Sequence, residues 1–215
     1  MAAAFAERAS RCEIVGRSSS TFTRLLRIFA SELGVSYSFR IARDLTSLKT
    51  IDYADNPALK LPALVRPDGT WFGALNACRA LWASAGSPIH VVWPEAMTTL
   101  LLGNAQELVS QAMTTEIALI MAKLGGVDQS TVYVGKLRIS LDASLSWLDA
   151  NLVGVSTSLP AERSLSHFEV ALFCLVDHLE FRQVTSLQPY SRLSEFRDRF
   201  AARPSASSTP YRFDS

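Results

Sequence analysis

Three consecutive serines, Ser18, Ser19 and Ser20, lie where side-chain hydroxyls can do chemistry. They follow a short apolar segment at 12–16 and precede an amphipathic segment at 21–33. A hydroxyl that donates a hydrogen bond favours the charged form of an acidic group, and the N-terminus of a helix does so as well. Serines at a helix start also act as caps, which stabilise a protein by about 1 kcal/mol. The residue types alone leave both roles open.

A second stretch, residues 56–77, reads NPALKLPALVRPDGTWFGALNA and has the features of a binding segment. Pro62 stands at the mouth of an apolar run, and Pro67-Asp68-Gly69 is a turn signal between two short strands. The pair Gly73-Ala74 then begins an expected helix. The N-terminus of that helix offers backbone N–H groups and a positive dipole end to a carboxylate.

The elements that position these residues form a mixed pattern over the first 86 residues. We expect a strand at 12–16, a helix after the serines, an alternating strand at 35–41, and then two short strands and a helix after Pro62. Residues 43–59 are expected to form an irregular loop with one helical turn. The apolar residues of the first helix recur at spacings of three and four: Phe22, Leu25, Leu26, Phe29 and Leu33.

The rest of the chain is predicted to be helical, beyond a Gly86-Ser87-Pro88 break that we interpret as a domain boundary. One long helix is expected from Pro94, bent near Gly103, and a second helix carries leucines at helical spacing up to Leu152. The stretch at 153–163 looks less regular.

Two further helices are expected near the end of the chain. Ser166 and Glu169 form a Ser-x-x-Glu capping box before an apolar helix, which we place at the buried centre of a bundle. A last helix over 190–203 ends at Pro204, and the polar residues 205–215 are expected to lie loosely on the surface.

Composition excludes several classes of function. The chain has 215 residues, 21 basic and 20 acidic, and no basic stripe or block that would favour nucleic acid or an acidic membrane surface. The N-terminus has no secretory signal, and the most apolar stretch, 168–176, is too short to span a bilayer. Three scattered cysteines, each flanked by apolar residues, are typical of buried free thiols, and the three histidines have no metal-ligand spacing. We therefore expect a cytoplasmic protein without a metal site.

The order of elements and four sequence segments resemble the cytosolic glutathione S-transferase superfamily over nearly the whole chain. NPALKLPALV is similar to the family's NPxxKxPAL segment, and PDGTWF to the hairpin that follows it. SHFEVALFCLVDHLEFR resembles the family's Ser-x-x-Asp helix, with Glu169 in place of Asp, and YSRLSEFRDRFAARPS resembles its closing segment. The resemblance implies an α+β fold. A thioredoxin-like glutathione-binding domain at 1–86, with residues 1–10 as a flexible extension, would precede an all-helical domain at 87–215.

The same resemblance implies roles for the serines. Aligned on Phe22 and Arg24, the segment is similar to S-P-x-(S/C)-P-F-x-R-x-x-R, so Ser20 falls where Ser-type members place the hydroxyl that stabilises the thiolate of glutathione. Ser18 and Ser19 are close alternatives. A free thiol has a pKa of about 8.5, so the thiolate needs such a donor at neutral pH. No cysteine lies nearby, so the mixed-disulfide chemistry of Cys-type members is not expected.

Glutathione recognition is implied at two further places. In the family a cis bond precedes the residue matching Pro62, which turns the Leu61 backbone toward the cysteinyl unit of glutathione. A basic or polar residue from the preceding loop holds the glycyl carboxylate, and Lys49, Lys60 and Arg43 are the candidates.

The γ-glutamyl end departs from the family pattern. Members have an acid followed by Ser or Thr where this chain has Gly73-Ala74. The loss of two hydrogen bonds to charged groups would weaken binding by about 10²–10⁴-fold. Asn76 is a substitute only if the helix start is shifted.

Three functions therefore remain open. The first is a Ser-type glutathione S-transferase that uses glutathione as co-substrate and no metal. It would act on a small hydrophobic electrophile bound near the start of the long helix, around Thr98, Thr99, Asn104 and Gln106. The second is a non-catalytic interaction or regulatory protein on this fold, and the third is an enzyme that uses a different thiol or acidic ligand. The family also implies a homodimer, with Trp71, Phe72 and the long helix as contact elements, and neither nucleic acid nor a membrane as partner.

Overall fold

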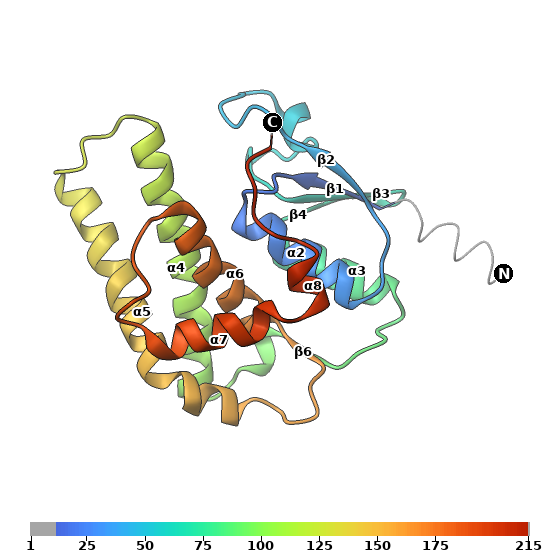
Figure 1. Cartoon of the computed structure of the whole chain (residues 1–215). Coiled ribbons are helices and arrows are strands. Elements are labelled where there is room, and N and C mark those ends of the chain that lie inside the picture. Colours follow the sequence, from blue (N-terminus) through green and yellow to red (C-terminus); the bar gives the residue numbers. More distant parts are fainter. Residues whose placement is uncertain (1–11, 215) are drawn as a thin grey trace. The chain divides into compact units, whose positions relative to one another are not determined.

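The computed structural model describes residues 12–214, which form two compact units (Figure 1). The first unit contains residues up to Ile89 together with 202–214, and the second contains His90–Ala201. Sequence analysis placed the boundary at Gly86 and assigned the whole C-terminal part to the helical domain. The extension predicted at residues 1–10 lies outside the described residues.

The first unit is a four-stranded sheet covered by helices. Its strands are β1 (Glu13–Gly16), β2 (Ser38–Ile41), β3 (Ala63–Arg66) and β4 (Gly69–Phe72), in the order β2-β1-β3-β4. Strand β1 is parallel to β2, and β3 is antiparallel to both β1 and β4. Helices α2 (Thr21–Glu32) and α3 (Ala74–Ser84) pack against each other on one face of the sheet (Figure 1), and the 3-10 turn η1 (Thr50–Tyr53) interrupts the loop before β3. This is the predicted thioredoxin-like arrangement.

The core of this unit explains where α2 begins. Leu26, Phe29 and Ile14 are fully buried between α2 and the sheet. A Cβ at Gly16 would lie only 2.4 Å from the Thr23 hydroxyl oxygen, so the glycine allows the first turn of α2 to approach the end of β1. The strand end and the helix start are therefore fixed against each other.

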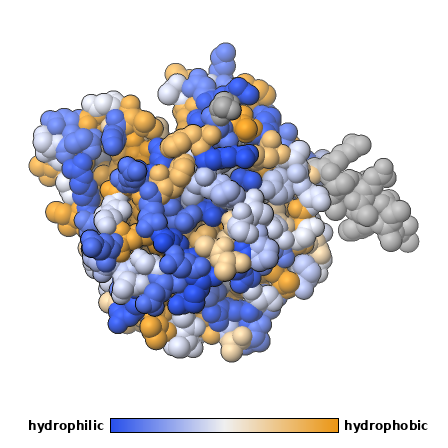
Figure 2. Space-filling model, viewed as in Figure 1, coloured by the Kyte–Doolittle hydropathy of each residue, from blue (hydrophilic) through white to orange (hydrophobic). Residues whose placement is uncertain are grey.

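The second unit is helical. It contains α4 (Leu100–Leu124), α5 (Val132–Ser158), α6 (His167–Arg182) and α7 (Ser191–Ala201), with the turn η2 (Pro94–Ala96) and the short parallel strands β5 (Val91–Val92) and β6 (Leu165–Ser166). Helix α6 is buried on nearly every side and packs against α4 and α7, as predicted for the centre of a bundle. On the face shown in Figure 2, hydrophobic residues lie among hydrophilic ones over both units.

Two predictions about this unit are wrong. Helix α5 runs through most of the stretch at 153–163, because Leu152 and Val155 are buried and extend its packed face. Ser166 is the N-cap of α6, but its side chain makes no cap hydrogen bond, and the Glu169 carboxylate pairs with the Arg163 guanidinium at 2.6 and 2.9 Å. A two-pronged charged hydrogen bond is stronger than a neutral one. The hydrogen bonds that the Arg163 guanidinium donates to Glu169 raise the pKa of Arg163.

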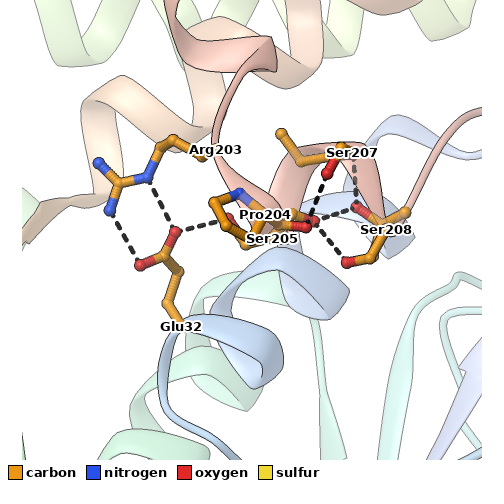
Figure 3. Close-up of polar contacts among 8 residues, drawn as sticks. Glu32, Arg203, Pro204, Ser205, Ser207 and Ser208 are labelled. Carbon is orange, nitrogen blue, oxygen red and sulfur yellow. Dashed lines mark hydrogen bonds and ion pairs between the residues drawn. The ribbon is translucent and has the colours of Figure 1, made fainter.

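The prediction that residues 205–215 lie loosely on the surface is wrong for residues 205–209. After α7 the chain forms α8 (Pro204–Ser207), which packs on α2 and buries Ser205, Ala206 and Thr209. The Arg203 guanidinium donates two hydrogen bonds of 2.9 Å to the Glu32 carboxylate, and the Ser205 hydroxyl donates a third (Figure 3). Glu32 ends α2, where the helix dipole disfavours a negative charge, so these donors compensate an otherwise unfavourable position.

The same contacts set the ionisation of Glu32. Burial alone would raise the pKa of this carboxyl, but the hydrogen bonds from Arg203 and Ser205 outweigh burial and leave the pKa below its usual value. A carboxyl with a lowered folded-state pKa stabilises the fold above its unfolded pKa of about 4.3, and this contribution is lost as pH falls through the folded value.

We predict that Glu32→Gln lowers the free energy of unfolding by about 1–2 kcal/mol at pH 7, because Arg203 then loses its charged acceptor. The difference from the unsubstituted chain should shrink as pH falls below about 4. Urea unfolding at a series of pH values measures both effects.

Glu13→Gln is the matched control, because Glu13 pairs with Arg40 on the surface of the same unit. Its cost should lie within the 0–1 kcal/mol range of exposed pairs. Equal costs for the two variants would contradict the role given to Glu32.

Candidate functional site

The strand register brings three chain segments to one edge of the sheet. Val15 of β1 lies opposite Ala63 of β3, and Ala63 lies opposite Phe72 of β4. Strands β1 and β4 therefore end where β3 begins. Three segments adjoin these strand ends and therefore meet at this edge. The loop at 17–20 follows β1, the Leu61-Pro62 pair precedes β3, and the Gly73-Ala74 pair follows β4.

Ser20 is the N-cap of α2. Its hydroxyl oxygen accepts a hydrogen bond from the Thr23 N–H at 3.2 Å, and the side chain is half-buried. The O–H is a separate donor, so the cap leaves the hydroxyl proton for another acceptor. Both roles expected for Ser20, as cap and as donor to an anion, are therefore compatible.

The other two serines differ in accessibility. Ser19 is half-buried, whereas Ser18 is only 1% exposed. The Ser18 hydroxyl makes no hydrogen bond to any residue between 12 and 214. Of the alternatives to Ser20, Ser18 is therefore a buried donor that a ligand could reach only if its cover moved.

The Leu61-Pro62 peptide bond is cis, as the family resemblance implied. Within the described part of the chain, the N–H and C=O of Leu61 make no hydrogen bond. The segment before them is held by buried Asn56, whose side chain donates to the Lys60 carbonyl at 2.8 Å and accepts from the Ala58 N–H at 3.0 Å. A backbone donor and acceptor thus lie at the site edge on a fixed segment.

Gly73 is the N-cap of α3 and adopts φ 81° and ψ 144°. This left-handed φ strains any residue with a Cβ, which gives a conformational reason for glycine here. The first helical hydrogen bond runs from the Ala77 N–H to the Gly73 carbonyl at 3.0 Å, so the preceding N–H groups have no acceptor within the helix. The Asn76 side chain donates to the Phe72 carbonyl at 3.4 Å.

The basic candidates lie on the segment between β2 and β3. Lys49, Lys60 and Arg43 are exposed, with Lys49 at the start of η1 and Lys60 directly before Leu61. The Arg17 guanidinium donates to the Arg43 carbonyl at 3.3 Å, so this segment contacts the serine loop.

Sequence analysis missed the C-terminal residues that reach the serine loop. The Asp214 carboxylate accepts a hydrogen bond of 2.8 Å from the Ser18 N–H, and the Arg212 N–H donates to the Ser18 carbonyl at 3.4 Å. The Arg24 guanidinium lies 4.2 Å from the centre of the Tyr211 ring. Residues almost two hundred positions apart make these contacts, so no local pattern could have indicated them.

Of the four residues expected around an electrophile pocket, Thr98 and Asn104 are exposed, and Thr99 and Gln106 make structural contacts in the second unit. The Thr99 hydroxyl caps α4 by accepting from the Leu102 N–H at 3.3 Å. Gln106 is buried, and its side chain lies 3.4 Å from a ring nitrogen of His167. Gly103, where a bend was expected, lies in the first turn of α4.

Other expectations concern metals and membranes. Among residues 12–214 no group of three His, Cys, Asp or Glu side chains is placed to hold a metal ion. No helix in the described part of the chain has the length and apolar character needed to cross a membrane. Cys12, Cys78 and Cys174 are buried thiols that form no disulfide within the described residues, as predicted.

Comparison with known proteins gives a consistent result for the fold. The sequence matches no protein-family model, and no curated protein matches it. A glutathione S-transferase structure from Methylobacillus flagellatus with bound GSH is 19% identical, with a TM-score of 0.75 over 93% of this chain and 98% of that chain. One from Methylobacterium radiotolerans in complex with glutathione sulfonate is 18% identical, with a TM-score of 0.74 over 95% and 97%.

A glutathione transferase family member from Pseudomonas fluorescens with bound glutathione is 14% identical, with a TM-score of 0.72 over 94% of this chain and 99% of that chain. The similarity spans both units in each case. The chain therefore has the fold of the cytosolic glutathione S-transferases, as the sequence resemblance predicted.

Proposed function

We propose that this protein is a Ser-type glutathione S-transferase that stabilises the thiolate of glutathione for attack on a small hydrophobic electrophile. One observation carries the proposal. The Ser20 hydroxyl, the unpaired backbone of Leu61 and the N-terminus of α3 meet at a single edge of the sheet. Solved structures with this fold contain glutathione or glutathione sulfonate, which supports glutathione as the ligand.

Ser20 would act on the sulfur by hydrogen bonding. The Thr23 N–H donates to the Ser20 oxygen, and a hydroxyl that accepts one hydrogen bond donates a second one more strongly. Together with the positive end of α2, this donor lowers the pKa of the bound thiol. The thiol proton leaves to solvent, Ser20 keeps its own proton, and the sulfur then forms the bond to the electrophile. With a chlorodinitrobenzene the carbon–chlorine bond breaks and chloride leaves with the electron pair.

The rest of the tripeptide would be held by backbone and by charge. The cysteinyl unit pairs with the N–H and C=O of Leu61, as an added strand would. The γ-glutamyl carboxylate lies at the N-terminus of α3, and Lys49 or Lys60 reaches the glycyl carboxylate. Glutathione affinity should be weak, because Gly73-Ala74 supplies neither an acid for the ammonium group nor a hydroxyl for the carboxylate. No metal takes part, and the buried free cysteines are consistent with a cytoplasmic location.

We predict that Ser20→Ala raises the pKa of the bound glutathione thiol by about 1–2 units, because a hydrogen bond to a charged group contributes about 1.5–3 kcal/mol. Conjugation of glutathione to a chlorodinitrobenzene at pH 7 should fall about 10- to 100-fold. Calorimetric titration gives the affinity, and the ultraviolet absorbance of the thiolate gives the pKa.

Two variants separate chemistry from capping. Ser20→Thr keeps both the cap and a hydroxyl and should retain most activity, whereas Ser20→Asp keeps the cap but places a negative charge beside the sulfur and should be inactive. Ser20→Ala should also lose about 1 kcal/mol of stability through the cap. A fully active Ser20→Asp variant would exclude Ser20 as the donor, and no glutathione binding at all would favour a non-catalytic role.

We predict that Ala74→Ser tightens glutathione binding about tenfold, because the new hydroxyl can donate to the γ-glutamyl carboxylate at the start of α3. Ala83→Ser, at an exposed position near the other end of the same helix, should leave the affinity unchanged. The same titration measures both. Identical affinities for the two variants would show that the carboxylate binds elsewhere.

A homodimer is part of the proposal. Trp71 and Phe72 lie on β4, an edge strand of the sheet, and are 42% and 36% exposed. Exposed aromatic residues on an edge strand favour association with another chain. Sedimentation equilibrium should show a dimer that Trp71→Asp weakens and Ile51→Asp, at another exposed apolar position, does not. A stable monomer in the unsubstituted chain would overturn this part.

A further inference from the structure

The candidate site contains a segment of its own chain. Residues 210–214 run beside the loop that leads into α2 (Figure 1), and Asp214 places its carboxylate 2.8 Å from the Ser18 N–H. The Arg212 N–H bonds the Ser18 carbonyl from the same side. Ser18 is thus contacted through both of its backbone polar groups and is only 1% exposed.

The contact resembles the binding of an anionic ligand. The carboxylate lies on a backbone N–H two residues before the N-cap of α2, where the helix dipole favours negative charge. The Ser18 hydroxyl is also buried without a hydrogen-bond partner among the described residues, and so is the second Asp214 carboxylate oxygen. The contact with Asp214 therefore satisfies the Ser18 N–H and leaves the buried Ser18 hydroxyl without a partner.

The segment has a buried anchor at one end, and beyond it the contacts are those of Tyr211 with Arg24 and of Arg212 and Asp214 with Ser18. The anchor is α8 with the buried Thr209, fixed by the contacts of Glu32 with Arg203 and Ser205 (Figure 3). Beyond Thr209 the chain has no regular secondary structure, and Phe213 is 66% exposed. Segments with little buried surface open at low free energy, so residues 210–214 can leave the loop while α8 stays in place.

We propose that residues 210–214 form a strap that occupies the anion position at the start of α2, and that glutathione must displace this strap to bind. This inference rests on the proposed function, which names glutathione as the competing ligand and places its thiolate at the start of α2. A ligand that binds only the open state has its affinity reduced by the fraction of open molecules. A strap closed in about nine molecules out of ten would weaken glutathione binding about tenfold.

Amide hydrogen exchange tests the strap without any ligand. Asp214→Ala in the full chain, and truncation after Thr209, should each speed exchange of the Ser18 amide about tenfold or more, because its acceptor is removed. The Thr23 amide is the internal control, since its acceptor is the Ser20 hydroxyl in the same loop. Unchanged exchange at Ser18 in both variants would overturn the strap.

Glutathione titration tests the competition. The truncated chain should bind glutathione about tenfold more tightly than the full chain, and the peptide PYRFDS added in trans should reverse the gain and protect the Ser18 amide again. Equal affinities for the two chains would overturn the competition.

The two proposals fail in different ways. If the peptide protects Ser18 but neither chain binds glutathione, the strap stands as a cover of this loop and the glutathione S-transferase proposal fails. If both chains bind glutathione equally and Ser18 exchange does not change, the enzyme proposal stands and the strap fails.

Discussion

The antiparallel register of β1, β3 and β4 is the constraint on which the candidate site depends. Val15, Ala63 and Phe72 lie opposite one another, so the chain leaves β1, enters β3 and leaves β4 at one edge. A slip of one residue would turn every side chain of a strand to the other face of the sheet. Ala63 and Leu64 point to opposite faces of β3 and are both fully buried, so a slip would exchange a small and a large side chain between two packed faces. Packing on both faces therefore holds the serine loop beside Leu61.

Several residues of this edge serve the fold and the proposed chemistry at once. Ser20 caps α2 through its oxygen and retains its proton as a donor. Gly16 allows Thr23 to lie against the strand, and Gly73 provides a backbone conformation that favours glycine at the start of α3. The glycine that looks like a lost recognition residue in the sequence thus also has a conformational reason to be there. The type of a residue in this unit therefore does not tell by itself whether the residue serves the fold, the proposed chemistry or both.

Local patterns predicted the first unit well and its long-range contacts not at all. Apolar periodicity located α2, and the turn signal located the β3–β4 hairpin. The cis bond before Pro62 was implied by the family resemblance and not by a local pattern. The expected capping box failed because Arg163, outside the motif, binds Glu169 more strongly. The C-terminal contacts could not be predicted, since Glu32 and Arg203 are separated by the whole helical unit and neither residue type specifies its partner.

The first unit is assembled from both ends of the chain, with the second unit inserted between them. During synthesis, the residues up to Ile89 leave the ribosome before Arg203 and Ser205 have been made. Until then the Glu32 carboxylate at the end of α2 lacks the hydrogen-bond donors that Arg203 and Ser205 provide. Domains that fold during translation usually do so from the N-terminus. Here the sheet can form early, but α8 can dock only after the helical unit has been made. Completion of the first unit therefore requires that the helical unit has already been translated.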